Sequence, residues 1–147
     1  MAEKSLQVLL ALAAVFATGC NLSGSAGPCY HEYRDPVLLL EVRGSGRAGP
    51  VLSGVAVTAI TIDGRPMVPA ELSKPPSRGV TVSGDTLICQ AGCGFGTSEG
   101  RYTMTLGLQG YRPATVQVDA RYETSKGGCP SYNAGPTRFT TALAPEG

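Results

Sequence analysis

Cysteine is the residue type in this chain with the widest chemical range, and the sequence contains five cysteines. Cys20 follows an apolar N-terminal segment, and the other four are Cys29, Cys89, Cys93 and Cys129. An even number of cysteines in an exported domain predicts two disulfides, for which three pairings are possible. A zinc site of four thiolates is the competing interpretation, because Cys89 and Cys93 have a usable spacing. Free or catalytic thiols are the third, although no Cys-x-x-Cys motif is present to support thiol exchange.

The single histidine, His31, limits the acid–base and metal chemistry that the sequence offers. With Glu32 and Asp35 it forms a possible metal-ligand set, but one imidazole rarely suffices, and we expect these residues to be solvated. A serine hydrolase would need His31 as its base, and the sequence has no Gly-x-Ser-x-Gly elbow. The glycines of Gly44–Gly49 do not open a helix, as a phosphate-binding loop must. We therefore expect no enzyme activity, no cofactor and no metal.

The pattern of residues at the N-terminus predicts an export signal. Leu6–Phe16 is apolar apart from Gln7, and it is shorter than the roughly 20 residues that span a bilayer. Such a segment is typical of a secretory signal peptide, here residues 1–19. The following Ala17-Thr18-Gly19-Cys20 resembles the bacterial lipobox, which implies a lipidated Cys20 anchored in the membrane. A plain signal peptide cut near Gly19 is the alternative.

Residues 20–35 are predicted to be the lipidated cysteine and a flexible tether. Asn21–Pro28 is rich in Ser and Gly, and eight residues reach at most about 29 Å when extended. Asn21, rather than Asp, favours an outer-membrane or cell-surface location by resemblance to lipoprotein sorting.

Alternation of apolar and polar residues predicts strands through most of the remaining chain. The clearest is Arg101–Gln109, where Tyr102, Met104, Leu106 and Leu108 share one face. Four prolines make Arg65–Arg78 an irregular excursion or an edge. Strands are also expected at Val37–Arg43, Gly54–Ile62, Ala114–Arg121 and Pro136–Leu143, and at Gly79–Ser83 with Thr86–Cys89 as a strand pair or one bulged strand. Short strands separated by turns predict an all-β, seven-stranded Greek-key β-sandwich.

The strand around Tyr102 carries a resemblance to a known family. Glu99–Leu106, the following Gly110–Pro113 and then Val116–Val118 resemble the carboxypeptidase regulatory-like domain, which has a transthyretin-like fold. Gly54–Val57 and Thr141–Pro145 are similar to other strands of that family, so the resemblance covers residues 36–145. It implies a non-catalytic module that supports folding, binding or surface attachment. The four cysteines and the proline-rich insert depart from the family pattern.

The order of strands predicts two chemically different ends of the domain. Cys93 precedes the Arg101–Gln109 strand and Cys129 follows its antiparallel partner, so both are expected at one end, facing the membrane. If the first strand runs parallel to the last, Cys29 joins them, as do Tyr30, Tyr33, Phe95, Tyr122 and Tyr132. The opposite end would hold Arg43, Arg47, Tyr111 and Arg112 as a possible partner surface, although the aromatic residues would also serve simply to pack around disulfides.

Composition and charge leave binding or structural work as the expected function. The net charge is +1, which gives no electrostatic reason to expect a nucleic-acid partner. We expect a membrane-anchored, non-catalytic envelope lipoprotein with a protein or glycan partner. The alternative is a small-ligand carrier, which a pocket lined by Met104 would support, or an envelope enzyme with an unrecognised site.

Overall fold

The computed structural model describes residues 35–123 and 135–147. The predicted signal peptide, Cys20, Cys29, His31 and Cys129 therefore lie outside the described residues. The elements in chain order are β1 (Leu38–Gly44), β2 (Val55–Ile62), β3 (Arg65–Pro66), α2 (Pro69–Leu72), β4 (Arg78–Ser83), β5 (Thr86–Phe95), β6 (Gly100–Gly107), β7 (Ala114–Ala120) and β8 (Thr137–Leu143). The all-β class predicted from the sequence is confirmed.

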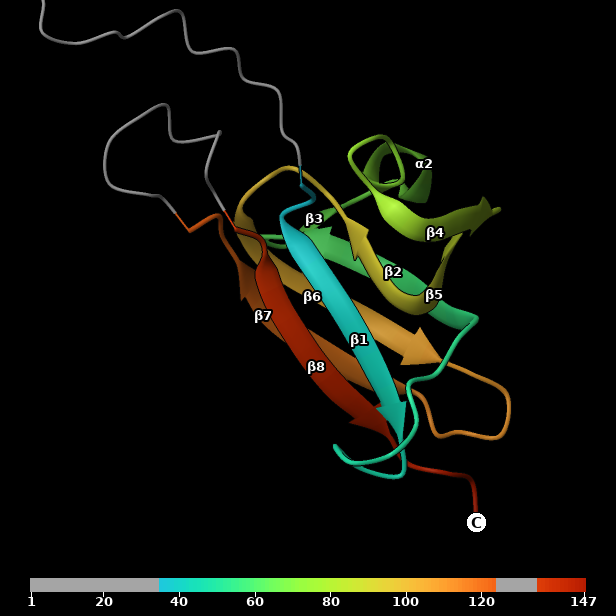
Figure 1. Ribbon diagram of the computed structural model, residues 1–147. Helices are drawn as coiled ribbons and strands as arrows, with labels where there is room; N and C mark the ends of the chain where they lie inside the picture. Colours follow the sequence, from blue (N-terminus) through green and yellow to red (C-terminus); the bar gives the residue numbers. More distant parts are fainter. Residues whose placement is uncertain (1–34, 124–134) are drawn as a thin grey trace, which may run out of the picture.

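The strands form one eight-stranded sheet with the order β7-β6-β2-β5-β1-β8, while β3 pairs with β2 and β4 pairs with β5. β1 and β8 lie in front of β6 and β7, so the sheet folds over on itself into two layers (Figure 1). The free edges of β7 and β8 meet at both ends, which nearly closes the sheet into a barrel. The sequence predicts a seven-stranded sandwich, whereas the structure has this single continuous sheet.

A threonine side chain joins the two edges at one end of the sheet. The Thr137 hydroxyl accepts a hydrogen bond from the Arg121 N–H and donates one to the Arg121 C=O, both at 2.8 Å. At the other end Tyr111 forms an antiparallel bridge to Pro145. Side-chain and bridge contacts therefore replace a regular β7–β8 ladder.

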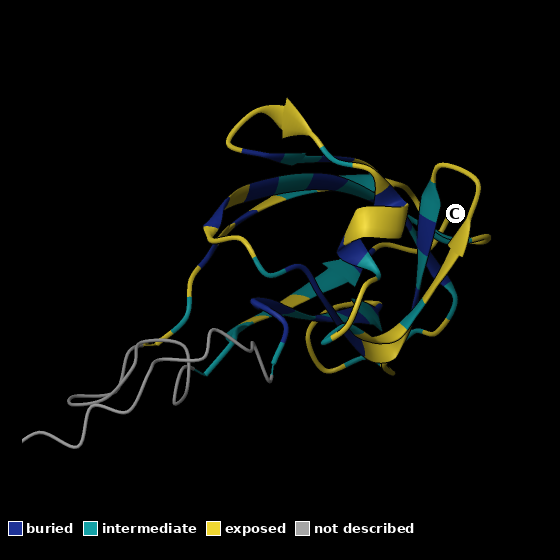
Figure 2. Ribbon diagram, turned by 90° about the horizontal axis from the view of Figure 1, so that it is seen from above, coloured by how far each residue is buried: buried dark blue, intermediate teal, exposed yellow. Residues whose placement is uncertain are grey.

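The core fills the space between the layers, because alternate side chains of each strand point inward. In β1 the predicted inward residues Leu38, Leu40 and Val42 are all buried, and in β6 so are Tyr102 and Met104. Figure 2 shows buried positions alternating along the strands with intermediate or exposed ones. The predicted antiparallel pairing of β6 with β7 is confirmed, and β1 runs parallel to β8, which is the condition stated for the two ends of the domain.

Two parts of the fold depart from the sequence-based expectation. β5 continues to Phe95, past the predicted end at Cys89, and changes partner as it does so. Its first half pairs with β2, where Val55 faces Cys89, and its last residues pair with β1, where Leu38 faces Phe95. The second departure is α2, which forms inside the proline-rich stretch with Pro69 in its first turn.

Candidate functional site

The structure brings the four residues of the predicted partner surface to one end of the domain, where β1 and β8 finish. The β1–β8 register pairs Gly44 with Leu143, and the Tyr111–Pro145 bridge adds the β6–β7 turn to the same end. Asp35 lies at the opposite end, where Tyr122 donates from its hydroxyl to the Asp35 C=O at 2.9 Å. We call the end formed by Arg43, Arg47, Tyr111 and Arg112 the distal end.

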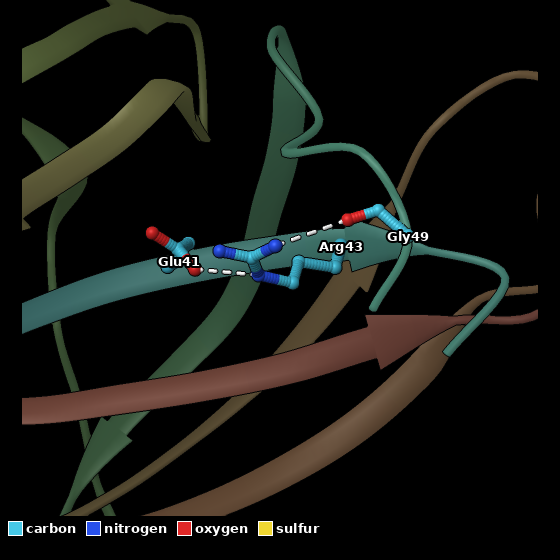
Figure 3. Close-up of polar contacts among 3 residues, drawn as sticks. All are labelled: Glu41, Arg43 and Gly49. Carbon is cyan, nitrogen blue, oxygen red and sulfur yellow. Dashed lines mark hydrogen bonds and ion pairs between the residues drawn. The ribbon is translucent and has the colours of Figure 1, made fainter. Parts of the chain in front are cut away.

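Arg43 at the distal end is held by its own domain. Its Nε donates to a Glu41 carboxylate oxygen at 2.7 Å, and a terminal nitrogen donates to the Gly49 C=O at 3.1 Å (Figure 3). The side chain is about one-third exposed. Arg43 therefore fixes the loop that follows β1 and presents little of its charge to a partner.

Tyr111 is also engaged within the fold, whereas the other two arginines are exposed. The Tyr111 ring is half-buried and occupies the space that Gly44 leaves by lacking a side chain: a Cβ there would lie 2.7 Å from the Tyr111 hydroxyl. Arg47 and Arg112 are exposed, and the Arg112 N–H donates to the Ala144 C=O at 2.8 Å. The chemistry that the distal end offers outward is thus mainly two guanidinium groups beside a tyrosine edge.

Of the four predicted disulfide cysteines, the structure describes Cys89 and Cys93, and these two form a disulfide with each other. Both are buried, whereas Gln90, Ala91 and Gly92 between them are exposed. The bond spans the point at which β5 passes from its β2 partner to its β1 partner. It therefore closes a short bulge and holds together the two halves of the strand that links the layers.

We expect the double substitution Cys89→Ala with Cys93→Ala to lower the free energy of unfolding by about 2 kcal/mol, because a five-residue ring no longer restrains the unfolded chain. Urea unfolding of the two proteins measures this difference. Reduction of the unsubstituted protein with dithiothreitol should reproduce it. Equal stability of the oxidised, reduced and substituted proteins would contradict a role for the bond in the fold.

A groove of about 580 Å³ lies between α2, the turn after it and the loop that joins β5 to β6. Met67 and Leu72 supply apolar wall, and a Lys74–Glu71 ion pair of 2.6 Å stands at its exposed rim. Tyr102 also lines the groove and donates from its hydroxyl to the Ser98 C=O at 2.8 Å. Met104, the residue expected in a carrier pocket, is instead fully buried in the core.

Burial raises the pKa of Tyr102 to about 12 from its usual 10. The hydroxyl is therefore neutral at physiological pH and already committed to Ser98. This chemistry suits a structural donor and opposes use of Tyr102 as a general base.

The Tyr102 shift predicts a specific loss of stability at high pH. Since the folded-state pKa is about 12 and the unfolded value is 10, the unfolded chain releases the proton first. The stabilising contribution is fully present below pH 10 and is lost as the pH rises through 12. The free energy of unfolding, measured between pH 10 and pH 12, should fall more steeply for the unsubstituted protein than for Tyr102→Phe. Parallel curves for the two proteins would contradict the raised pKa of Tyr102.

Sequence reasoning missed the groove because residues 65–78 were expected to be irregular. A local signal was present, since Pro69 followed three residues later by Leu72 is the pattern of one helical turn with an apolar face. Gly96 carries no comparable signal. Its φ is +77°, and a Cβ there would lie 2.5 Å from the Tyr102 hydroxyl, a closeness that depends on the conformation of the β5–β6 loop.

Residues 35–123 and 135–147 contain neither a cluster of metal ligands nor a helix that could cross a membrane. In that part of the chain no three His, Cys, Asp or Glu side chains lie close enough to hold a metal ion. The same residues contain no helix of a length and apolarity that would cross a membrane. His31 and Glu32 fall outside these ranges, while Asp35 forms an exposed ion pair with Arg78 at 3.2 Å.

No protein-family model, no curated protein and no solved structure matches the chain.

Proposed function

We propose that the chain is an exported, lipid-anchored and non-catalytic module of a bacterial envelope, attached through Cys20 to the outer membrane or cell surface. The observation that carries this proposal is the Cys89–Cys93 disulfide, which is built into the core where β5 changes partner. Disulfides persist in oxidising compartments outside the cytosol. Together with the lipobox-like Ala17–Cys20, the bond supports export followed by anchoring.

The position of Asp35 supports an orientation on the membrane. The fourteen residues 21–34 separate Cys20 from the described domain, and a chain of that length reaches at most about 50 Å. Asp35 lies beside Tyr122, at the end opposite the distal end. An anchor at Cys20 therefore joins the domain to the membrane at the Asp35 end and leaves the distal end accessible to partners.

We further propose that the fold is a variant of the carboxypeptidase regulatory-like, transthyretin-like sandwich. The two-layered sheet and the β6–β7 hairpin around Gly110 and Tyr111 support this resemblance. So does the number of longer strands, which is seven when the two-residue β3 is set aside. In that family the module supports binding or attachment without performing catalysis.

The proposed partner is an envelope protein that contacts the distal end. Arginine and tyrosine are enriched in protein interfaces, and Arg47 and Arg112 present their charge outward there. An acidic surface would complement the two guanidinium groups. Envelope glycan is the other candidate and is a separate outcome of the test below.

Capture from detergent-solubilised envelopes tests the proposal. We expect the unsubstituted protein to recover a stoichiometric protein and the double variant Arg47→Glu with Arg112→Glu to lose at least about tenfold in recovery, equivalent to 1.4 kcal/mol. Arg65→Glu with Arg121→Glu is the matched control, since both residues are exposed and lie away from the distal end. Recovery of glycan alone, or equal recovery by both variants, would contradict the protein-partner proposal.

The groove beside Tyr102 favours a second candidate, a carrier of a small ligand. Its apolar wall and polar rim combine the features of small-molecule sites. Native mass spectrometry of protein isolated from envelopes would show a bound small molecule if the carrier function is right. Protein that is uniformly free of ligand would argue against it.

A further inference from the structure

The outer edge of β4 is an open backbone edge within the described residues. β4 pairs with β5 on one side, and no described strand pairs with its other side. Five of its six residues are exposed, and Figure 2 shows exposed residues along almost its whole length. Its Val82 is one of the exposed large apolar residues, at 39% exposure. An exposed strand edge is a template for pairing with another strand.

The β4–β5 turn determines which backbone groups face outward. Ser83 and Thr86 flank the two-residue turn Gly84-Asp85, in which Gly84 has a φ of +57°. In such a hairpin the flanking pair exchanges hydrogen bonds, and the following pairs alternate. Val82 and Val80 therefore direct their N–H and C=O groups away from β5, toward the free edge.

The free edge is complementary to itself. Two copies that use the same edge of β4 must run antiparallel, related by a two-fold axis. With the axis at Thr81, Val80 of one copy faces Val82 of the other, and the outward N–H and C=O groups of both pairs meet. A shift by one residue would place valine opposite threonine instead.

We propose that a second copy of this chain pairs with β4, so that two β4 strands join antiparallel about Thr81 and extend the sheet across a two-fold axis. The inference concerns the folded domain and goes beyond the proposed function, since it does not depend on the anchor or on the distal end. The bulge where β4 shifts register between Arg78 and Val80 shortens the usable edge. The resulting dimer is accordingly weak and concentration-dependent.

A single cysteine substitution tests the register directly. In this register Thr81 of one copy lies opposite Thr81 of the other. The two residues form a non-hydrogen-bonded pair, so their Cα atoms lie about 4.5 Å apart, a distance that a disulfide can span. Oxidation of full-length Thr81→Cys in detergent should yield a covalent dimer well above the level of the unsubstituted protein. Ser83→Cys is the matched control, since Ser83 lies two residues from the axis in each copy and therefore about 13 Å from its own copy. Both residues are exposed, so neither substitution disturbs the core.

Equal dimer yields from Thr81→Cys and Ser83→Cys, or no dimer above background, would overturn the proposal. In cell extracts, an adduct of Thr81→Cys with another polypeptide in place of itself would also overturn it.

Association in solution gives an independent measurement. Sedimentation equilibrium of the full chain in detergent should show Val82→Lys weakening dimerisation by roughly tenfold or more, since the lysine replaces the valine that faces Val80 of the other copy beside the axis. Val51→Lys adds the same charge at another valine of similar exposure, 37%, away from β4, and should leave association unchanged. Monomers at all concentrations, or equal weakening by both variants, would overturn the proposal.

Discussion

Tyr102→Ala is expected to lower the free energy of unfolding by about 3–5 kcal/mol, as truncation of a large buried aromatic residue does. Tyr102 is fully buried between the layers, on the inward face of β6 near the start of the strand. Its ring packs edge-to-face on Phe95, with the centroids 6.4 Å apart. Its hydroxyl also donates to the Ser98 C=O and fixes the loop above the groove. Equilibrium unfolding in urea measures the loss.

Tyr102→Phe separates the packing contribution from the hydrogen bond. The phenylalanine keeps the ring contact with Phe95 and leaves the Ser98 C=O without this donor, so a smaller loss of about 1–2 kcal/mol is expected. Equal losses for the alanine and phenylalanine variants would show that the hydroxyl, and not the buried ring, dominates at this position. A loss below about 1 kcal/mol for Tyr102→Ala would contradict its place in a packed core.

Cys20→Ser is expected to abolish incorporation of labelled fatty acid into the protein. Only a thiol at this position carries the proposed diacylglycerol, and two or more acyl chains give stable anchoring where one does not. Metabolic labelling followed by immunoprecipitation measures the incorporation. Labelling is the direct readout because an uncleaved signal segment would hold the variant at a membrane without any lipid.

Cys29→Ser is the matched control for the anchor. It removes a nearby cysteine of the same N-terminal region and should leave the label in place. Loss of label in both variants, or in neither, would contradict lipidation of Cys20.

The positions of the strands followed from the sequence because the signal is local. Alternating burial shows in a few successive residues, and so β1, β6 and β7 lie within one or two residues of their predicted bounds. For Gly79–Ser83 and Thr86–Cys89 the sequence allows either a strand pair with a turn at Gly84-Asp85 or one bulged strand. The structure has the strand pair.

The arrangement of the strands was less predictable from the sequence, since it depends on contacts between distant residues. The exposed run Gln90–Gly92 interrupts the alternation of β5, and the three buried residues after it follow no period-two pattern. They are buried because β5 passes there between the layers, beside β1. The sequence of residues 93–95 alone does not indicate that β1 lies beside them.

The candidate site was predictable to a similar extent. Strand direction placed Arg43, Tyr111 and Arg112 at one end, which the register of β1 with β8 reproduces. That Arg43 would be held by Glu41 and Gly49 was not predictable, because the loop conformation that brings the Gly49 C=O within reach is tertiary.

The intact mass of the mature protein, isolated from envelope membranes, tests the central proposal most directly. The lipid-anchored, disulfide-stabilised module predicts a chain that begins at Cys20 and carries a diacylglycerol and an amide-linked acyl chain, with at least the two hydrogens of Cys89 and Cys93 missing. A mass that matches an unmodified N-terminus and free thiols at Cys89 and Cys93 would contradict both the anchor and the compartment.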